Sequence, residues 1–294
     1  MKDGEILLKE LGGNTIQLLS LSGEVKTVLD TFQMRPLAIH VNKDNEVIVG
    51  MREQGPPFPV QDFSVRQLII FGSGYQRKVT LEFDKGGNKL FSNANRIRTD
   101  SRNVVYVIDR FDNANHVIVG MREQGPPFPV QDFSVRQLII FGSGYQRKVT
   151  LKFDKGGNKL FSNANRIRTD SRNVLYVIDR FDNANHGRIV AVDINGCLNL
   201  TYDGPKDLGT FQPEGITITP SDNIVVADFY NKALHVINSK GDFLGLLFIF
   251  KDLDINYPSI LCFDTEGYLS IGCCRGENEG FGKIHFVKIL DSLM

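Results

Sequence analysis

Apolar and polar residues alternate along much of this chain in short runs separated by polar turns. In segment 36–50, Leu37, Ile39 and Val41 alternate with other residues, a turn rich in Asn and Asp follows, and Val47 and Val49 continue the pattern. Alternation with a period of two on both sides of such a turn is typical of a β-hairpin. We therefore predict two paired strands on either side of residues 42–46.

The same hairpin pattern recurs through the chain. Matching points of its turn are separated by 58, 70, 50 and 44 residues and are occupied by Asn45, Asn103, Asn173, Asn223 and Gly267. A second hairpin belongs to most units, with Gly23, Gly74, Gly196 or Gly241 at its turn. Four short antiparallel strands in roughly 40 to 50 residues have the size of a propeller blade. The sequence therefore predicts an all-β propeller of four-stranded antiparallel blades.

A recent tandem copy is superimposed on these older repeats. Residues 47–116 recur at 117–186, an offset of 70, with only Glu82 changed to Lys152 and Val105 to Leu175. With this copy we count six units, at about 5–31, 32–90, 91–160, 161–209, 210–255 and 256–293, in one domain that spans residues 1–294. The third unit is a hybrid, because VIVG at 117–120 repeats a strand position that VVYVIDR already fills. Two arrangements are open: VIVG takes the third strand position, or it loops out.

Composition describes a folded chain without a global charge preference. Hydrophobic residues make up 41% and charged residues 23%, and 34 Lys and Arg balance 34 Asp and Glu. Affinity for nucleic acid would therefore need a local basic patch. The start of the chain is unlike a signal peptide, and the apolar stretch 244–250 is too short to span a bilayer. We expect a soluble, cytoplasmic protein that makes no membrane contact.

The sequence carries no motif for a metal or a nucleotide. Its four cysteines lack the spacing of a zinc site, and neither a Walker loop nor a G-x-S-x-G elbow occurs. Aspartates 109, 179 and 228 end the second strand of successive units, and a residue repeated at one blade position favours a capped turn over an active site. We expect no metal, no cofactor and no enzymatic activity.

One segment resembles a known repeat family. Residues 226–244, VADFYNKALHVINSKGDFL, look like an NHL repeat, and VIDRFDNANHGRIVAVDINGCL is similar to another. NHL propellers of this form resemble the C-terminal domains of tripartite-motif ubiquitin ligases. That resemblance implies a recognition module that selects the ligase's target, with ligase activity in a separate domain, since a RING is not found in this sequence.

Two repeated clusters of arginine are the first candidate binding site. In NRIRTDSRN, alternation puts the first two arginines opposite the isoleucine, and a third lies in the turn. The innermost strand of a blade lines the central channel, so these side chains would form a positive mouth for RNA phosphates or an acidic peptide. The alternative is that they pair with nearby aspartates or stay solvated. The candidates are Arg96, Arg98, Arg102, Arg166, Arg168 and Arg172.

Long proline-rich loops supply the second candidate. The loops at 51–65 and 121–135 combine arginine, prolines and an aromatic residue, and stiff apolar loop tips lose little entropy on binding. Phe58 and Phe128 are the predicted anchors. The alternative is an insertion folded back on its own blade.

The resulting hypothesis is a non-catalytic propeller that binds protein or RNA, or both, on its loop face. The sequence does not choose between these partners, and it does not indicate an oligomeric state. The alternative from another class is a hydrolase of the calcium-dependent lactonase type, which shares the six-bladed architecture.

Overall fold

The structure is a computed structural model. It describes residues 5–9, 13–54, 65–83, 87, 89–91, 94–109, 137–142, 145, 147–181, 186–249, 253, 255–263, 267–274 and 282–288. No helix in these ranges is long and apolar enough to cross a membrane.

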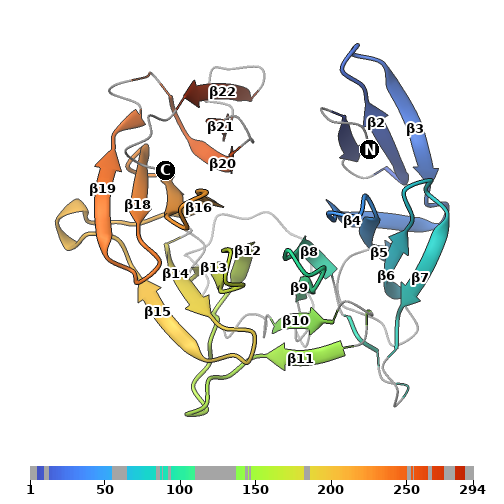
Figure 1. Cartoon of the computed structure of the whole chain (residues 1–294), viewed down its shortest axis with the longest axis horizontal. Helices are drawn as coiled ribbons and strands as arrows, with labels where there is room; N and C mark the ends of the chain where they lie inside the picture. The colour runs from blue at the N-terminus through green and yellow to red at the C-terminus, as the bar shows by residue number, and fades with distance from the viewer. Residues whose placement is uncertain are drawn as a thin grey trace, which may run out of the picture. The chain divides into compact units, whose positions relative to one another are not determined.

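The described chain forms six antiparallel sheets in sequence order, which Figure 1 traces from blue to red. It divides into two compact units, residues 1–152 and 153–294, with three sheets in each. The fold class predicted from the sequence is confirmed: the protein is an all-β, six-bladed β-propeller. The prediction of one domain over residues 1–294 stays a prediction.

The first unit contains three blades. Blade 1 is β1 (Ile6–Lys9), β2 (Thr15–Leu19) and β3 (Val25–Asp30). Blade 2 is β4 (Met34–Val41), β5 (Val47–Glu53), β6 (Arg66–Phe71) and β7 (Arg77–Leu81). Blade 3 is β8 (Ala94–Thr99), β9 (Val105–Asp109), β10 (Gln137–Phe141) and β11 (Arg147–Leu151).

The second unit contains the other three. Blade 4 is β12 (Ala164–Thr169), β13 (Leu175–Arg180), β14 (Gly187–Val192) and β15 (Leu198–Tyr202). Blade 5 is β16 (Pro213–Ile218), β17 (Ile224–Asp228), β18 (Ala233–Ile237) and β19 (Phe243–Leu247), and the 3-10 turn η1 (Lys206–Leu208) precedes it. Blade 6 is β20 (Pro258–Phe263), β21 (Tyr268–Cys273) and β22 (Lys283–Lys288).

Burial follows the place of a strand within its blade. The middle strands β5, β6, β9, β10, β17 and β18 are buried along almost their whole length, whereas the outer strands β3 and β7 are largely exposed. Strands with both faces covered need continuous runs of Val, Ile and Leu, because neither face meets water. Inside each unit, the hydrophobic clusters accordingly lie between successive blades.

The strand pairing of the hybrid blade decides between the two predicted arrangements. Leu138 and Ile140 of β10 lie opposite Ile108 and Tyr106 of β9, and β11 completes the sheet. The third position therefore belongs to Gln137–Phe141, so β11 is not displaced outward. Residues 117–120 lie outside the described residues. Blade 3 thus joins the inner strands of one repeat to the outer strands of the other.

In two turns the residue in the left-handed conformation is the neighbour of the turn residue singled out from the sequence. In blade 5 the residue with positive φ is Asp222 (φ 63°), not Asn223, because the turn closes with Asp222 N donating to Thr219 O. In blade 2, Tyr75 (φ 62°) takes the left-handed conformation rather than Gly74, because Tyr75 N donates to Gly72 O. The copied Tyr145 has φ 60°. A large side chain rarely adopts this conformation, so both tyrosines need stabilising contacts.

Candidate functional site

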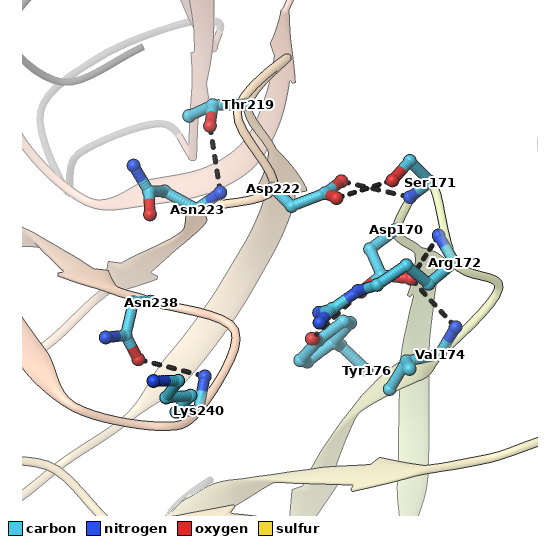
Figure 2. A network of polar contacts seen from close by, with 10 residues as sticks. All are labelled: Asp170, Ser171, Arg172, Val174, Tyr176, Thr219, Asp222, Asn223, Asn238 and Lys240. Carbon is cyan, nitrogen blue, oxygen red and sulfur yellow. Dashed lines mark hydrogen bonds and ion pairs between the residues drawn. The ribbon is translucent and has the colours of Figure 1, made fainter.

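The turn arginines are held by buried aspartates. In blade 4, the backbone N–H groups of Arg172 and Val174 donate to Asp170 Oδ1 at 3.0 and 2.9 Å, and the Arg172 guanidinium and the Tyr176 hydroxyl donate to Oδ2 (Figure 2). Burial, followed by the charge of Asp170, raises the pKa of Tyr176 to about 12. The Arg172 side chain remains 54% exposed while the Asp170 carboxylate is fully buried. The turn therefore presents a fixed, half-exposed guanidinium.

The earlier copy of this turn repeats the arrangement. Arg102 and Val104 donate their backbone N–H groups to Asp100, and the guanidinium of Arg102 lies 3.0 Å from Asp100 Oδ2. Two of the predicted binding residues, Arg102 and Arg172, thus form the ion pairs with aspartate that the sequence left open as the alternative. Their role in binding a ligand stays a prediction.

Neighbouring inner turns are joined by side chains. Ser171 donates from N and Oγ to the carboxylate of Asp222 at 3.0 and 2.5 Å, which ties the first turn of blade 4 to that of blade 5 (Figure 2). In the other unit, Asn103 donates to Asp44 and so ties blade 3 to blade 2. Each of these turns is therefore fixed against its neighbour within its own unit.

In the second unit, the predicted-site residues Arg166 and Arg168 form hydrogen bonds with other inner strands. From β12, Arg166 Nε donates to Glu214 O of β16 at 2.6 Å. Arg168 donates to Ile167 O at 2.9 Å and to Leu261 O of β20 at 3.3 Å. The two guanidinium groups therefore connect the inner strands of blades 4, 5 and 6.

Arg180 adds a third cation beside this pair, one that the sequence patterns did not single out. Its guanidinium forms an ion pair with the Glu214 carboxylate. The amide of Asn165, oriented with its oxygen toward Arg180, accepts from NH1 at 2.8 Å. Glu214 is thus shared between Arg166, through its carbonyl, and Arg180, through its carboxylate.

The corresponding arginines of the first unit lie on β8. Arg98 NH1 donates to Ile97 O at 3.0 Å, which is the contact that Arg168 makes with Ile167. Arg96 lies close enough to Lys9 to act on it: burial lowers the pKa of Lys9, and repulsion from Arg35 and Arg96 lowers it further. The two copies therefore place the guanidinium groups of Arg98 and Arg168 in the same way.

The aspartates that end the second strands are buried structural acceptors. Asp179 Oδ1 accepts from the backbone N–H groups of Ser162 and Asn163, both at 2.7 Å, and Oδ2 accepts from Arg188 at 3.2 Å. Asp109 accepts a hydrogen bond at 3.0 Å from the side-chain amide of Gln137, which lies opposite it on β10. Both carboxylates are 0% exposed. The backbone N–H bonds to Asp179 are those of the predicted capping role.

His235 of β18 lies in a buried polar network. It is 0% exposed, with Nε2 3.1 Å from Asp228 Oδ2 and Nδ1 2.9 Å from the Tyr202 hydroxyl. An aspartate, a histidine and a hydroxyl in line resemble a catalytic relay, but Asp228 and His235 are both closed to solvent. The network fastens β15, β17 and β18 together.

Two further expectations concern the loops and metals. Phe58 and Phe128 lie outside the described residues, so their predicted role as anchors stays a prediction. Within the described ranges, no group of three or more His, Cys, Asp or Glu side chains is arranged to hold a metal ion.

A family model described as NHL repeat matches residues 212–237, which hold β16, β17 and β18 of blade 5. No curated protein matches the chain. The resemblance to tripartite-motif ligases therefore stays a prediction, whereas an NHL repeat within a six-bladed propeller is confirmed.

Solved structures match over nearly the whole chain. A streptogramin B lyase aligns with TM-score 0.60 and 11% identity over 100% of this chain and 83% of that one. Virginiamycin B lyase from Staphylococcus aureus aligns with TM-score 0.58 and 13% identity, over 99% and 83%. A gluconolactonase from Xanthomonas campestris aligns with TM-score 0.54 and 14% identity, over 91% and 78%.

These matches correct one prediction. The sequence motifs predicted a chain without enzymatic activity, but the propellers that share its fold here include lyases and a gluconolactonase. The absence of familiar short motifs was a weak guide, because a propeller can assemble an active site from single residues on several blades. At 11–14% identity these matches establish the fold alone.

Proposed function

We propose that this protein is a recognition propeller in which the inner-strand arginines of β12, Arg166 and Arg168, bind an acidic segment of a partner protein. The observation that carries the proposal is the repeated placement of one guanidinium group. Arg98 and Arg168 each donate NH1 to the preceding carbonyl oxygen, at 3.0 and 2.9 Å, so both are held on the inner strand before any ligand arrives. A cation fixed in advance loses little side-chain entropy on binding.

The chemistry of these residues favours a carboxylate ligand. A guanidinium group is planar and always charged, and its fork of donors matches a carboxylate in two parallel hydrogen bonds. Because the chain has no net charge, attraction must come from such local clusters. NHL propellers generally mediate protein interactions, and the NHL match on blade 5 supports a protein partner in preference to RNA.

Charge reversal tests this proposal. We expect Arg166→Glu/Arg168→Glu to weaken binding of a fluorescent ten-glutamate peptide by at least about tenfold, the equivalent of about 1.4 kcal/mol. Fluorescence anisotropy at fixed salt measures the affinity, and Lys26→Glu/Arg77→Glu, which reverses two charges on the exposed strands β3 and β7, is the matched control. Equal affinity in the reversed and control proteins would overturn the proposal. Tighter binding of a ten-nucleotide RNA than of the peptide would favour RNA as the partner.

We further propose, from the resemblance to tripartite-motif propellers, that the bound partner is a target for ubiquitination in the cytoplasm. The support is the NHL match and the repeat pattern around it. Fusion of the chain to a RING-containing ligase domain tests this role in cells. Ubiquitination of an acidic-tagged reporter should require the two arginines on β12, and a signal that survives their reversal would argue against it.

A second candidate function is enzymatic, of the lyase or lactonase type. It is supported by the alignment of the whole chain with a streptogramin B lyase and of 91% of it with a gluconolactonase. Hydrolysis of gluconolactone and ring opening of a streptogramin, each measured with and without added calcium, test it directly. Turnover above that of a heat-denatured sample would establish this candidate, and its absence in both assays would remove it.

A further inference from the structure

The turns between the second and third strands of blades 4 and 5 carry an aromatic residue at the same position. Phe181 and Tyr230 each follow a buried aspartate, Asp179 or Asp228, by two residues. Phe181 is 46% exposed and Tyr230 is 61% exposed. Tyr230 lies outside the tandem copy, so the repetition is not a product of that copy. A single exposed aromatic residue is ordinary, but exposure repeated at one blade position indicates a shared surface.

The turn of blade 5 holds Tyr230 on a rigid support. Asp228 accepts hydrogen bonds from the backbone N–H of Asn231 at 3.2 Å and from its side-chain amide at 2.7 Å. The same amide donates to Thr210 O at 2.7 Å, and His235 Nε2 lies 3.1 Å from the Asp228 carboxylate. Because this network fixes the turn before any ligand arrives, binding there loses little conformational entropy.

The turn of blade 4 orients Phe181 by contacts within its own blade. Phe181 N donates to His186 O at 2.7 Å, which closes the turn. The guanidinium carbon of Arg188 lies 5.5 Å from the centre of the Phe181 ring, and Arg188 Nε donates to the buried Asp179. A cation over the face of a ring favours one ring orientation. Phe181 is therefore held in place and exposed at the same time.

One connector joins these two turns. It is the segment 210–212, between β15 and β16. Phe211 O accepts a hydrogen bond at 3.2 Å from Gly187 N, where the turn of blade 4 ends. Gln212 O accepts one at 3.0 Å from Phe229 N, where the turn of blade 5 begins. The two aromatic turns therefore lie at one end of blades 4 and 5, on either side of the connector.

The arginine site lies at this same end of the blades. Arg166 Nε donates to Glu214 O at 2.6 Å, and Glu214 follows Gln212 by two residues. Arg180, which directly precedes Phe181, forms an ion pair with the Glu214 carboxylate. Cationic groups and the aromatic turns thus meet where β16 begins.

We propose that Phe181 and Tyr230 bind aromatic side chains of the same acidic partner segment whose carboxylates Arg166 and Arg168 bind. This inference rests on the proposed function, because it describes the remainder of one ligand. Aromatic pairs gain more than the apolar area that they bury, since ring faces and ring edges carry opposite partial charges. A cationic ligand on these rings would be repelled by the arginines beside them. The partner is therefore a segment in which aromatic residues lie among aspartates and glutamates.

Fluorescence anisotropy with two peptides tests this inference. One is the ten-glutamate peptide, and the other has phenylalanine in place of two of its central glutamates. We expect the unchanged chain to bind the phenylalanine peptide at least about tenfold more tightly. Tyr230→Ala and Phe181→Ala should each lose most of this gain and keep the affinity for the ten-glutamate peptide. Tyr230→Phe keeps the ring and should keep the gain.

Phe243→Ala is the matched control. Phe243 is 45% exposed, but it begins β19 and so lies at the end of blade 5 opposite to Tyr230. This variant should bind both peptides as the unchanged chain does.

The results that would overturn this inference differ from those that would overturn the proposed function. Equal affinity of the unchanged chain for both peptides, or a gain that survives both Tyr230→Ala and Phe181→Ala, would overturn the aromatic site and leave the arginine site standing. Failure of the ten-glutamate peptide to bind would overturn the proposed function and this inference with it. A ten-nucleotide RNA whose binding Tyr230→Ala weakens more than that of either peptide would assign the rings to bases and overturn the inference.

Discussion

At the scale of single residues, equivalent aspartates behave differently according to their partners. Burial raises the pKa of Asp179, and its backbone donors and Arg188 offset only part of this effect. Burial also disfavours the charge of Asp228, but hydrogen bonds from His235 and Asn231 outweigh it and lower the pKa of that carboxyl. The aspartates at this position in blades 4 and 5 therefore change the stability of the protein with pH in opposite directions.

The first prediction concerns this difference in pH dependence. Because the folded-state pKa of Asp228 is lowered, its stabilising contribution is present above the unfolded pKa and is lost as the pH falls through the folded value. Because that of Asp179 is raised, its ionisation destabilises the fold as the pH rises. Urea unfolding between about pH 6 and about pH 3 should show that Asp228→Asn flattens the acid-induced loss of stability and Asp179→Asn steepens it. Identical slopes in the two variants would contradict the assignment.

A second residue-scale prediction uses the duplicated tyrosines. Tyr75 and Tyr145 share local sequence and positive φ, and the hydroxyl of Tyr145 donates to the buried Glu46. Although burial opposes the charge of Glu46, hydrogen bonds from Lys78, Tyr145 and Asn42 lower its pKa. Tyr145→Phe should therefore lower the free energy of unfolding by about 1–3 kcal/mol.

The matched change in the other copy is the control. Tyr75→Phe should cost less than Tyr145→Phe in the same urea titration, because the cross-blade bond to Glu46 belongs to Tyr145. Equal losses in the two variants would mean that this bond does not stabilise the protein.

At the scale of strands and sheets, successive blades approach closely where a glycine removes a side chain. A Cβ atom at Gly50 of β5 would lie 2.5 Å from the carbonyl oxygen of Ala94 on β8. That oxygen is backbone, so it cannot move aside without shifting its strand. Gly50 therefore fixes how closely blade 3 approaches blade 2.

The third prediction follows from this close approach. Gly50→Ala should destabilise the protein by about 1–3 kcal/mol, as overpacking in a core does. Gly245→Ala on the outer strand β19 is the control, since a Cβ there meets nothing within 4 Å, and its effect should stay within about 0.5 kcal/mol. Denaturant midpoints measure both. A Gly50→Ala protein as stable as the control would show that the blades can move apart freely.

Alternation and turn residues identified the hairpins and the blade units, because both depend on neighbours in sequence. The pair of exposed aromatic residues, Phe181 and Tyr230, was missed, since their turns are joined only by a connector between blades. His235 was missed because an aspartate seven residues earlier, across the β17–β18 hairpin, is its partner. The identity of a ligand is harder still to predict from local sequence, because it depends on side chains that several strands bring together.

At the scale of the whole molecule, the six-bladed count depends on blade 3. Its inner strands β8 and β9 repeat as β12 and β13 in blade 4, and its outer strands β10 and β11 repeat β6 and β7 of blade 2. Blade 3 can form because the apolar residues of β9 pair with β10 as those of β5 pair with β6, and β10 is a copy of β6. Val107 lies opposite Ile139 where Val49 lies opposite Ile69.

Cysteine cross-linking of this pair tests the six-bladed account most directly. The four cysteines, Cys197, Cys262, Cys273 and Cys274, are first replaced by serine. Residues that lie opposite each other in antiparallel strands are close enough to form a disulfide. Val107→Cys/Ile139→Cys should cross-link on mild oxidation of the folded protein, and Val119→Cys/Ile139→Cys, the pairing copied from blade 2, should not. Cross-linking of the second pair and not the first would show that residues 117–120 occupy the position assigned to β9 beside β10, and the account of blade 3 would be wrong.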